Sequence, residues 1–244
     1  MIAQSVRDEL APSGTLRVGI NYGNAVLATR DAASGELRGV AVDLARELER
    51  RCELPVELVA FESAGKMTAA LRSGAWDAAF LAVEPGRAEE IAFTAPYLLI
   101  EGTYLIPPGS PIHAIADVDR AGVRVGVSTG SAYDLYLSRN LQQAQMIKAV
   151  NPNMAFGLLI DGKVDVVAGV RQALIANAAK LPGSRVFDER FMAIEQAMGM
   201  PHGCPAALHF LREFIEAVKA SGFVAQALER AGIRGVAVAP PAVP

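Results

Sequence analysis

The sequence predicts an α/β protein made of two similar lobes. Short β-rich runs alternate with amphipathic helical stretches, a pattern typical of parallel sheets with right-handed helical crossovers. The β-rich run at residues 16–20 recurs almost residue for residue at residues 123–127, which indicates that a second α/β unit starts there. Extended apolar stretches at residues 91–107 and 191–200 lie on either side of that second unit. We therefore expect two lobes linked by two extended connections.

The first lobe begins with a strand that ends at the turn-forming residues Asn21 to Asn24. From Val40, apolar and small residues recur at helical spacing and charged residues take the remaining positions, so an amphipathic helix follows. Gly74 closes a second helix, as glycine often does at helix ends. The elements predicted after the first helix are a strand at 56–61, a helix at 64–73 and a buried strand at 76–83.

The second lobe repeats this order of strands and helices. Its first strand breaks at Ser128, Thr129 and Gly130, where polar and small residues follow the β-rich run. After the second extended stretch we expect an amphipathic helix that Gly222 ends, then a short helix and an unpacked, proline-rich tail. The remaining predicted elements are helices at 131–140, 154–160, 172–180 and 224–231 and strands at 146–150 and 164–170.

Length and composition exclude several classes of protein. The 244 residues suffice for one to two domains, and 52% hydrophobic with 20% charged residues exclude a disordered chain. A net charge of −3 without a basic cluster predicts no nucleic-acid partner. No stretch approaches the roughly 18 uncharged apolar residues of a membrane span. Residues 1–14 lack the features of a secretory signal, so we expect either a cytoplasmic protein or one whose signal was removed.

Cysteine usage and the known motifs predict neither a cofactor nor a metal. Cys52 and Cys204 have no metal-type spacing, and we expect two buried thiols, with a disulfide between them as the alternative. No G-x-G-x-x-G follows the first strand and no Walker A sequence occurs. No cluster of histidine, cysteine and carboxylate residues has the spacing of metal ligands.

Four segments carry a family resemblance. They contain a G-x-x-x-D-L-A helix, an arginine that runs into F-T-x-P-Y, and a G-V-x-x-G-S turn. In this order and spacing they resemble the family 3 extracellular solute-binding proteins of ABC transporters, from Gly14 to about Ile233. The segments are LRGVAVDLARELERR, WDAAFLAVEPGRAEEIAFTAPY, VRVGVSTGSAYDLYLSRNL and GKVDVVAGVRQAL.

The resemblance implies a type II periplasmic-binding-protein fold, in which two α/β lobes are joined by two crossing strands with the ligand cleft between them. Lobe 1 would comprise residues 1–105 and 198–244, and lobe 2 residues 106–197. The resemblance also implies a monomer in the periplasm that captures a small carboxylate-bearing ligand, an amino acid or a related organic acid. Such a protein closes about a hinge and serves a membrane ABC permease without catalysis.

Arg87 matches the arginine that clamps the ligand's carboxylate in this family. That role suits a planar, permanently charged fork of hydrogen-bond donors. The alternative is a solvated arginine beside Glu89 and Glu90. Because the F-T-x-P-Y segment at residues 93–97 is in register with Arg87, we favour the ligand role.

The turn Ser128, Thr129, Gly130 and Ser131 links a strand to a helix. Free backbone N–H groups and the helix dipole at such a place predict an anion site. The alternative is a plain helix cap, with Ser131 at the N-cap and Asp134 three residues on.

The same turn fits the G-x-S-x-G nucleophile elbow of hydrolases. A triad would then need an acid and a histidine later in the chain, but no later histidine has an apparent orienting partner, so hydrolysis is the weaker hypothesis. The residues in triad order are Asp165 or Asp188 with His202 or His209, whereas His113 precedes the serine.

Further candidates are implied by position in the family. An aromatic residue after the first strand usually packs over the ligand, small hydroxyl residues lie near the end of the third strand, and an aspartate pairs with the ligand's ammonium group. The positions that correspond here are Tyr22 or Asn24, Phe80 and Ala82, and Val170. Glu101 and Gln196 are polar residues within the extended connections, where each either faces the cleft or is exposed at the hinge.

Val170 is the main departure from the pattern of amino-acid binders. Since valine carries no charge, an ammonium group beside it would be unpaired in a closed cleft and would lose several kcal/mol. The ligand then lacks that group or pairs it with Glu84 or Glu101. The enzymatic alternative is a dehydratase of prephenate or arogenate on the same scaffold, in which one of these acids protonates a leaving hydroxyl. A sensory ligand-binding module is the third hypothesis.

Overall fold

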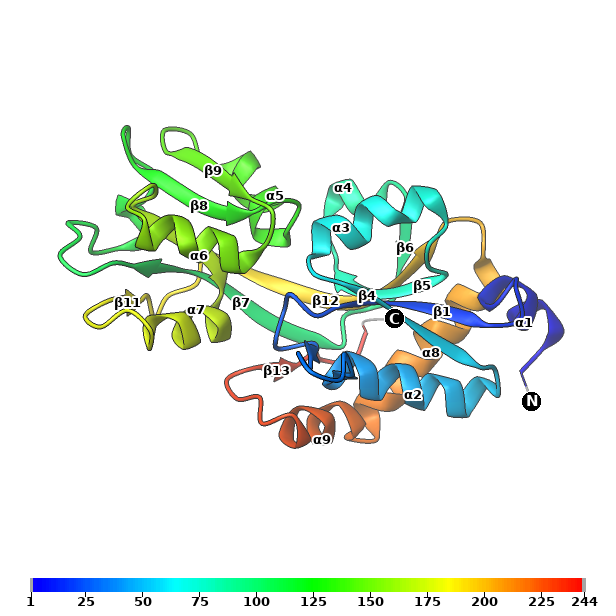
Figure 1. The fold of residues 1–244 in the computed structure, drawn as a ribbon. Helices are drawn as coiled ribbons and strands as arrows, with labels where there is room; N and C mark the ends of the chain where they lie inside the picture. Colours follow the sequence, from blue (N-terminus) through cyan, green and yellow to red (C-terminus); the bar gives the residue numbers. More distant parts are fainter. Residues whose placement is uncertain (1, 243–244) are drawn as a thin grey trace. The chain divides into compact units, whose positions relative to one another are not determined.

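A computed structural model describes residues 2–242, which form two compact units (Figure 1). Unit 1 runs up to Leu99 and resumes at Glu195, and unit 2 comprises Ile100–Ile194. The sequence placed these divisions a few residues later on both sides. Both divisions fall inside strands, β7 (Leu98–Ile106) and β12 (Met192–Pro201), which continue from one unit into the other. No turn therefore marks them in the sequence.

The sheet of unit 1 is mostly parallel, as the alternation of strands and helices predicts. Strand β1 (Leu16–Asn21) lies between β4 (Val56–Phe61) and β5 (Ala78–Ala82) and is parallel to both. Strand β12 then pairs antiparallel with β5, and β6 (Ile91–Phe93) pairs with β12. The carboxyl ends of β1 and β5 thus lie at one edge of the sheet, where loops present side chains to ligands in such folds.

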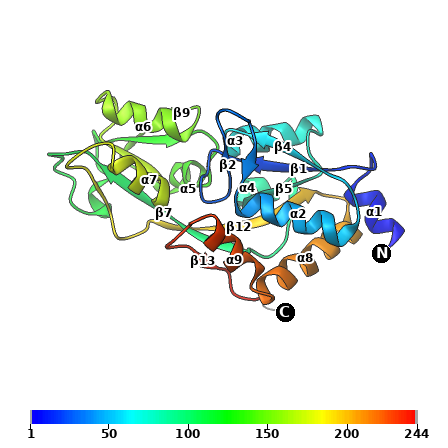
Figure 2. The same ribbon diagram turned by 60° about the horizontal axis from the view of Figure 1, so that its bottom comes forward.

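Helices cover both faces of this sheet. In Figure 1, α3 (Ala64–Ala69) lies above the sheet and α2 (Val40–Cys52) below it. On the side of α2, Figure 2 shows α8 (Pro205–Ala220) and α9 (Phe223–Arg230) next to it. The remaining elements of unit 1 are helices α1 (Gln4–Leu10), η1 (Ala70–Ser73) and α4 (Pro85–Ala88) and strands β2 (Thr29–Arg30), β3 (Leu37–Arg38) and β13 (Ala237–Val238).

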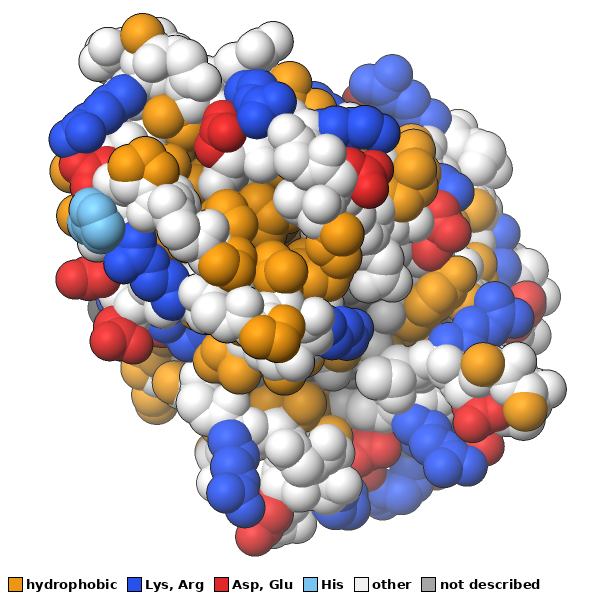
Figure 3. Space-filling model, turned by 60° about the vertical axis from the view of Figure 1, so that its left-hand side comes forward, with side chains coloured by type: hydrophobic (Ala, Val, Ile, Leu, Met, Phe, Trp, Pro, Cys, Tyr) orange, Lys and Arg blue, Asp and Glu red, His pale blue; other side chains and the backbone are white. Residues whose placement is uncertain are grey.

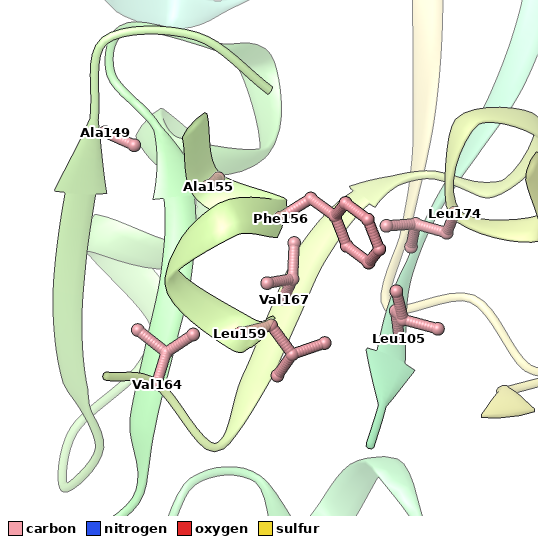
Figure 4. Close-up of a cluster of buried hydrophobic side chains, with 8 residues drawn as sticks. All are labelled: Leu105, Ala149, Ala155, Phe156, Leu159, Val164, Val167 and Leu174. Carbon is pink, nitrogen blue, oxygen red and sulfur yellow. The ribbon is translucent and has the colours of Figure 1, made fainter. Parts of the chain in front are cut away.

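Unit 2 repeats the strand order of unit 1. Strand β8 (Arg124–Ser128) lies between β9 (Gln145–Ala149) and β10 (Val166–Val170), parallel to both, and β7 pairs antiparallel with β10. Its core joins β10, β7 and two helices through the side chains that Figure 4 labels. The other elements are α5 (Ala132–Asn140), α6 (Pro152–Ile160), α7 (Arg171–Ala178), η2 (Ile115–Asp117) and β11 (Arg185–Val186).

The same arginine–aspartate contact fixes the central strand in each unit. In unit 1, the backbone N and the Nε of Arg17 donate to Oδ2 of Asp77 at 2.8 and 3.0 Å, and Nη2 donates to Oδ1 at 2.6 Å. In unit 2, Arg124 donates to Asp165 through the same three nitrogens at 2.8, 3.0 and 2.9 Å. These hydrogen bonds lower the pKa of the Asp165 carboxyl. The repeat seen in the sequence is therefore a repeat of contacts as well.

The expectations of an unpacked C-terminal tail and of two buried thiols are each only partly right. The tail is not unpacked throughout, because β13 pairs with Leu98 and Leu99 of β7 and Ala239 is buried. Alternating valine and alanine suffice for a short edge strand before the final prolines, while residues 243 and 244 lie outside the described residues. Cys52 and Cys204 are free thiols, the first buried and the second half-buried, and burial raises the pKa of both.

The difference in burial between the two aspartates gives a stability prediction. The side chain of Asp77 is 7% exposed and that of Asp165 is 36% exposed. We expect Asp77→Ala to lower the free energy of unfolding by about 3 kcal/mol, since it leaves a guanidinium unpaired in a partly buried place, and Asp165→Ala to lower it by about 1 kcal/mol. Urea unfolding followed by circular dichroism and by fluorescence of Trp76, the single tryptophan, measures both. An equal loss in the two variants would contradict the assigned role of burial.

Candidate functional site

Arg87 lies on α4, directly after the carboxyl end of β5. Only 3% of the residue is exposed, and its Nη1 donates to the carbonyl of Ala82 at 2.9 Å. Burial lowers the pKa of the guanidinium to about 10, and the charge of Glu84 acts in the opposite direction. The alternative of a solvated surface arginine is therefore wrong. Glu90, which that alternative placed beside Arg87, pairs with Arg72 at 2.7 Å.

The local sequence explains why the helix begins there. Pro85 stands at the first helical position, where proline's missing N–H is not needed. Glu84 is the N-cap, and its Oε2 accepts a hydrogen bond from the N–H of Gly86 at 2.9 Å. The cap turns the chain sharply at the end of β5 and carries Arg87 back toward the strand that precedes it.

Two further predicted residues lie on the strands around Ala82, the residue that Arg87 contacts. Gln196 on β12 is the cross-strand partner of Ala82, whose carbonyl holds Arg87. Gln196 is 4% exposed, so the alternative of an exposed hinge residue is wrong for it. Phe80 is fully buried, and its ring packs edge-on against Tyr97 with 5.7 Å between centroids. Phe80 thus belongs to the core beneath the site.

The turn after β1 is held by its own hydrogen bonds. Oδ1 of Asn21 accepts from the N–H of Gly23 at 3.0 Å, and Oδ1 of Asn24 accepts from the N–H of Val26 at 3.2 Å. A Cβ at Gly23 would lie 2.1 Å from a backbone oxygen, so the turn requires glycine. Tyr22 is half-buried, with the guanidinium of Arg30 5.7 Å from its ring centre. These contacts describe a structural turn; the ligand role of Tyr22 and Asn24 stays a prediction.

In unit 2, the turn after β8 does not offer the free amides that the sequence predicts. The N–H of Thr129 donates to a carbonyl of β9 at 2.8 Å, that of Gly130 to Oδ2 of Asp134 at 2.7 Å, and that of Ser131 to the carbonyl of Ser128 at 3.1 Å. The capping alternative is confirmed, because Oγ of Ser131 accepts from the N–H of Asp134 at 3.0 Å. An anion at this turn would compete with a carboxylate already present.

Asp134 and Tyr133 are the residues at this turn that the sequence analysis did not place near a ligand. Asp134 is buried, and Lys148 lies 3.0 Å from its Oδ1. Burial raises the pKa of Tyr133 to about 12, while hydrogen bonds with Ser131 and Ser128 act in the opposite direction. Three hydroxyl groups therefore gather at the start of α5. In the sequence, the only feature that pointed to this cluster was the acid at the third position of the helix, Asp134.

The carboxylate of Glu101 forms ion pairs with two arginines of unit 2. Nε of Arg171 donates to its Oε2 at 2.6 Å, and Nη1 of Arg190 donates to its Oε1 at 3.3 Å. Arg171 also donates to the carbonyls of residues 187 and 188 at 2.6 and 2.7 Å. Both oxygens of Glu101 are thus engaged, which weakens its candidacy as a ligand contact or proton donor. Val170 is buried at the N-cap of α7, directly before Arg171.

The hydrolase hypothesis finds little support. Ser128 stands in the required strand-to-helix turn, but Asp165 is engaged by Arg124. Nε2 of His202 lies 3.0 Å from the backbone carbonyl of Ala88. Nε2 of His209 lies 3.4 Å from a carboxylate oxygen of Glu213, one turn further along the same exposed helix face. Within residues 2–242, no group of three or more histidine, cysteine or acidic side chains could hold a metal ion.

Exposed hydrophobic side chains lie elsewhere on unit 2. All the large hydrophobic side chains found exposed in the described chain belong to this unit, and they are Val150, Met154, Ile160 and Ile175. The space-filling view of Figure 3 shows hydrophobic side chains around a hollow. Neither Arg87 nor the turn after β8 contributes to this set. No helix within residues 2–242 has both the length and the apolarity that a membrane span needs.

Comparison with known sequences decides the family. The sequence profile of the bacterial extracellular solute-binding proteins, family 3, matches residues 16–232. The chain belongs to this family. The solute-binding protein is 23% identical over 189 residues to a glutamine-binding protein of Geobacillus stearothermophilus, across 75% of this chain and 71% of that one. It is 29% identical over 131 residues to the virulence sensor protein BvgS of Bordetella bronchiseptica, across 53% of this chain and 10% of the sensor.

Solved structures confirm the type II periplasmic-binding-protein fold. The solute-binding protein superposes on the solute receptor for L-cysteine of Neisseria gonorrhoeae with a TM-score of 0.81 and 24% identity, covering 96% of both chains. An ancestral amino-acid-binding protein, a precursor of cyclohexadienyl dehydratase, gives a TM-score of 0.76 with 24% identity, covering 91% of this chain and 97% of that one. At a sequence identity of 24%, these superpositions show a shared fold and nothing about the ligand.

The engaged carboxylate gives a prediction about unit 2. In Glu101→Ala two guanidinium groups lose their shared partner, so we expect the free energy of unfolding to fall by about 1 to 2 kcal/mol. A double-mutant cycle with Arg171→Ala, followed by urea unfolding, should give a coupling of at least about 0.5 kcal/mol. A coupling near zero would show that the contact is not a stabilising one.

Proposed function

We propose that this solute-binding protein captures a small carboxylate-bearing solute, an amino acid or a related organic acid, and delivers it to an ABC permease without altering it. One observation carries the proposal: Arg87 is a guanidinium with 3% exposure at the carboxyl end of a central strand. A buried cation in that place favours an anionic partner, and a planar guanidinium can hold a carboxylate with two parallel hydrogen bonds. The family supports the same conclusion.

Relatives and similar structures are consistent with a fixed carboxylate clamp. They are described as a glutamine-binding protein, a receptor for L-cysteine, and a substrate-binding protein bound to L-arginine. These ligands differ in their side chains but share a carboxylate, which a single arginine can bind in every case.

Ligand-binding residues are proposed in both units. In unit 1 they are Arg87 and its neighbour Ala82, with Phe80 beneath them and Tyr22 and Asn24 in the turn after β1. In unit 2 they are the turn at residues 128–131 and Val170. Because Val170 is apolar and Glu101 is engaged by arginines, we propose that the part of the solute bound at Val170 is uncharged.

We propose a periplasmic monomer as the working form, by analogy with the family. Enzymatic dehydration is the competing hypothesis, and the contacts of the two acids named for it speak against it. Glu84 caps α4 and lies beside the charge of Arg87, and both oxygens of Glu101 are bonded to arginines. Incubation with prephenate and arogenate, followed by chromatography, should return both compounds unchanged. Consumption of either one would establish an enzyme.

Ligand binding should stabilise the protein against heat. At about 100 times the dissociation constant a bound acid adds roughly 2.7 kcal/mol, enough to raise the melting temperature by about 5 to 10 degrees. A panel of amino acids, 2-hydroxy acids and dicarboxylic acids measured by thermal shift identifies the solute. A panel without any shift would argue against the proposed function.

Loss of the clamp should weaken binding of whichever acid the panel selects. Arg87→Ala removes a charge-assisted contact, so we expect about a ten- to hundredfold increase in the dissociation constant measured by calorimetry. Arg72→Ala is the matched control, because Arg72 is an exposed arginine of unit 1 that pairs with Glu90. Equal affinities of wild type and Arg87→Ala would exclude Arg87 from the site.

An acid introduced at Val170 should reverse the charge preference. Val170→Asp places a carboxylate beside an uncharged part of the solute, so we expect weaker binding of the native acid and stronger binding of at least one zwitterionic amino acid. Val127→Asp is unsuitable as a control because it lies in the core, whereas Val150→Asp changes an exposed valine of the same unit. If Val170→Asp and Val150→Asp behave alike in calorimetry, Val170 does not contact the solute.

A further inference from the structure

Gln196 carries a buried polar atom that unit 1 does not satisfy. The residue lies on β12 and is 4% exposed, and its side-chain Oε1 has no hydrogen-bond partner within the described chain. A buried acceptor without a donor destabilises a folded protein, so nearly all such atoms are bonded. An apolar side chain would fit the strand at lower cost. The amide therefore requires an explanation outside the core.

The backbone of Gln196 is fixed, so only its side chain is available. The residue pairs with Ala82 on β5, and its carbonyl accepts a hydrogen bond from the N–H of Tyr97 at 2.8 Å. Two residues further along these strands, Met198 pairs with Phe80. Cross-strand partners and residues two apart project from the same face of a sheet. On the β5 side, the neighbours of the amide on its own face are thus apolar and offer no donor.

The amide lies next to the proposed carboxylate clamp. Ala82, the cross-strand partner of Gln196, supplies the carbonyl that accepts a hydrogen bond from Nη1 of Arg87 at 2.9 Å. The buried guanidinium and the unsatisfied amide oxygen therefore share one neighbouring residue.

Tyr97 carries a second polar atom without a partner, but its position assigns it to the core. The hydroxyl of Tyr97 has no hydrogen bond, the residue is 0% exposed, and its ring packs against Phe80. Burial raises the pKa of this hydroxyl well above its ordinary value. Since Oε1 of Gln196 is also unpartnered, the two side chains do not satisfy each other.

We infer that Oε1 of Gln196 accepts a hydrogen bond from an O–H or N–H group next to the carboxylate of the bound solute, which makes Gln196 a specificity-determining residue for 2-hydroxy and 2-amino acids. This inference rests on the proposed function, in which Arg87 binds the carboxylate. An amide oxygen is uncharged, so it accepts from a hydroxyl as well as from an ammonium group. A solute without either group leaves the oxygen unpaired and binds more weakly.

Three matched series of acids test the inference. Each series keeps the carboxylate and the carbon skeleton and replaces the 2-amino group by hydroxyl and then by hydrogen. The series are L-alanine, L-lactate and propionate; L-phenylalanine, L-3-phenyllactate and 3-phenylpropionate; and L-glutamate, L-2-hydroxyglutarate and glutarate. Affinities are measured by calorimetry for the wild type, Gln196→Met, Gln145→Met and Arg87→Ala. Gln145 is an exposed strand residue of unit 2, so its replacement is the same chemical change at a place without a ligand role.

The expected result is a loss confined to the acids that carry a donor. Gln196→Met should weaken the amino and hydroxy members of the series that bind about five- to thirtyfold and leave the plain acid unchanged, since methionine has similar size and no oxygen. Gln145→Met should change nothing, and Arg87→Ala should weaken all three members. Without ligand, Gln196→Met should melt no lower than the wild type, because the substitution removes an unsatisfied buried acceptor.

Other outcomes overturn the inference and identify what failed. Equal weakening of all three members by Gln196→Met would assign Gln196 a merely structural role, and so would a melting temperature several degrees lower without ligand. Unchanged affinities in Gln196→Met would remove it from the site while Arg87 keeps its role. If Gln196→Met discriminates as expected but Arg87→Ala binds like the wild type, the carboxylate clamp fails and the donor contact stands. If no acid binds the wild type, the proposed function fails and this inference fails with it.

Discussion

The arginine–aspartate contact at the amino ends of the strands is the constraint on which the two units depend. Arg17 is the second residue of β1, and Asp77 directly precedes β5, so their three hydrogen bonds fix the register of two parallel strands. That register determines which residues reach the opposite edge of the sheet, where β5 ends at Ala82 and α4 carries Arg87. In unit 2, Arg124 and Asp165 act in the same way on the strands that end at Ser128 and Val170. A contact far from the site along each strand thus positions the site.

The two units use this common frame with different chemistry. Unit 1 brings a buried guanidinium and a buried amide to the end of β5, whereas unit 2 brings hydroxyl groups, a buried carboxylate and a valine to the ends of β8 and β10. In unit 2 the charges are balanced internally, since Lys148 pairs with Asp134 and two arginines pair with Glu101. Under the proposed function, selectivity for the charge of the solute therefore depends chiefly on unit 1.

Most of the fold could be predicted from the sequence, because its periodicity and turn residues are local signals. Strand β4 and helix α2 begin where the pattern changes, and the repeated β-rich run identifies the second unit. Short elements such as α1 and β13 could not be predicted, since a few residues at a sheet edge or chain end carry little periodicity.

The contact partners of side chains could not be predicted either. Arg171 and Glu101 are 70 positions apart, and Gln196 gave no signal that distinguished a buried amide from an exposed one. Family resemblance rather than periodicity identified Arg87.

The discontinuity of unit 1 has a consequence for the order in which the protein can fold during synthesis. Unit 2 is one uninterrupted stretch, so all of its strands leave the ribosome before β12 is complete. Unit 1 must wait for β12, α8, α9 and β13, because β12 covers the edge of β5 and β13 pairs with the first residues of β7. Until then, the largely apolar strand β5 has an open edge, which is the kind of surface that associates with other nascent chains. Unit 1, whose first strands are synthesised before unit 2, is thus the unit whose sheet is completed last.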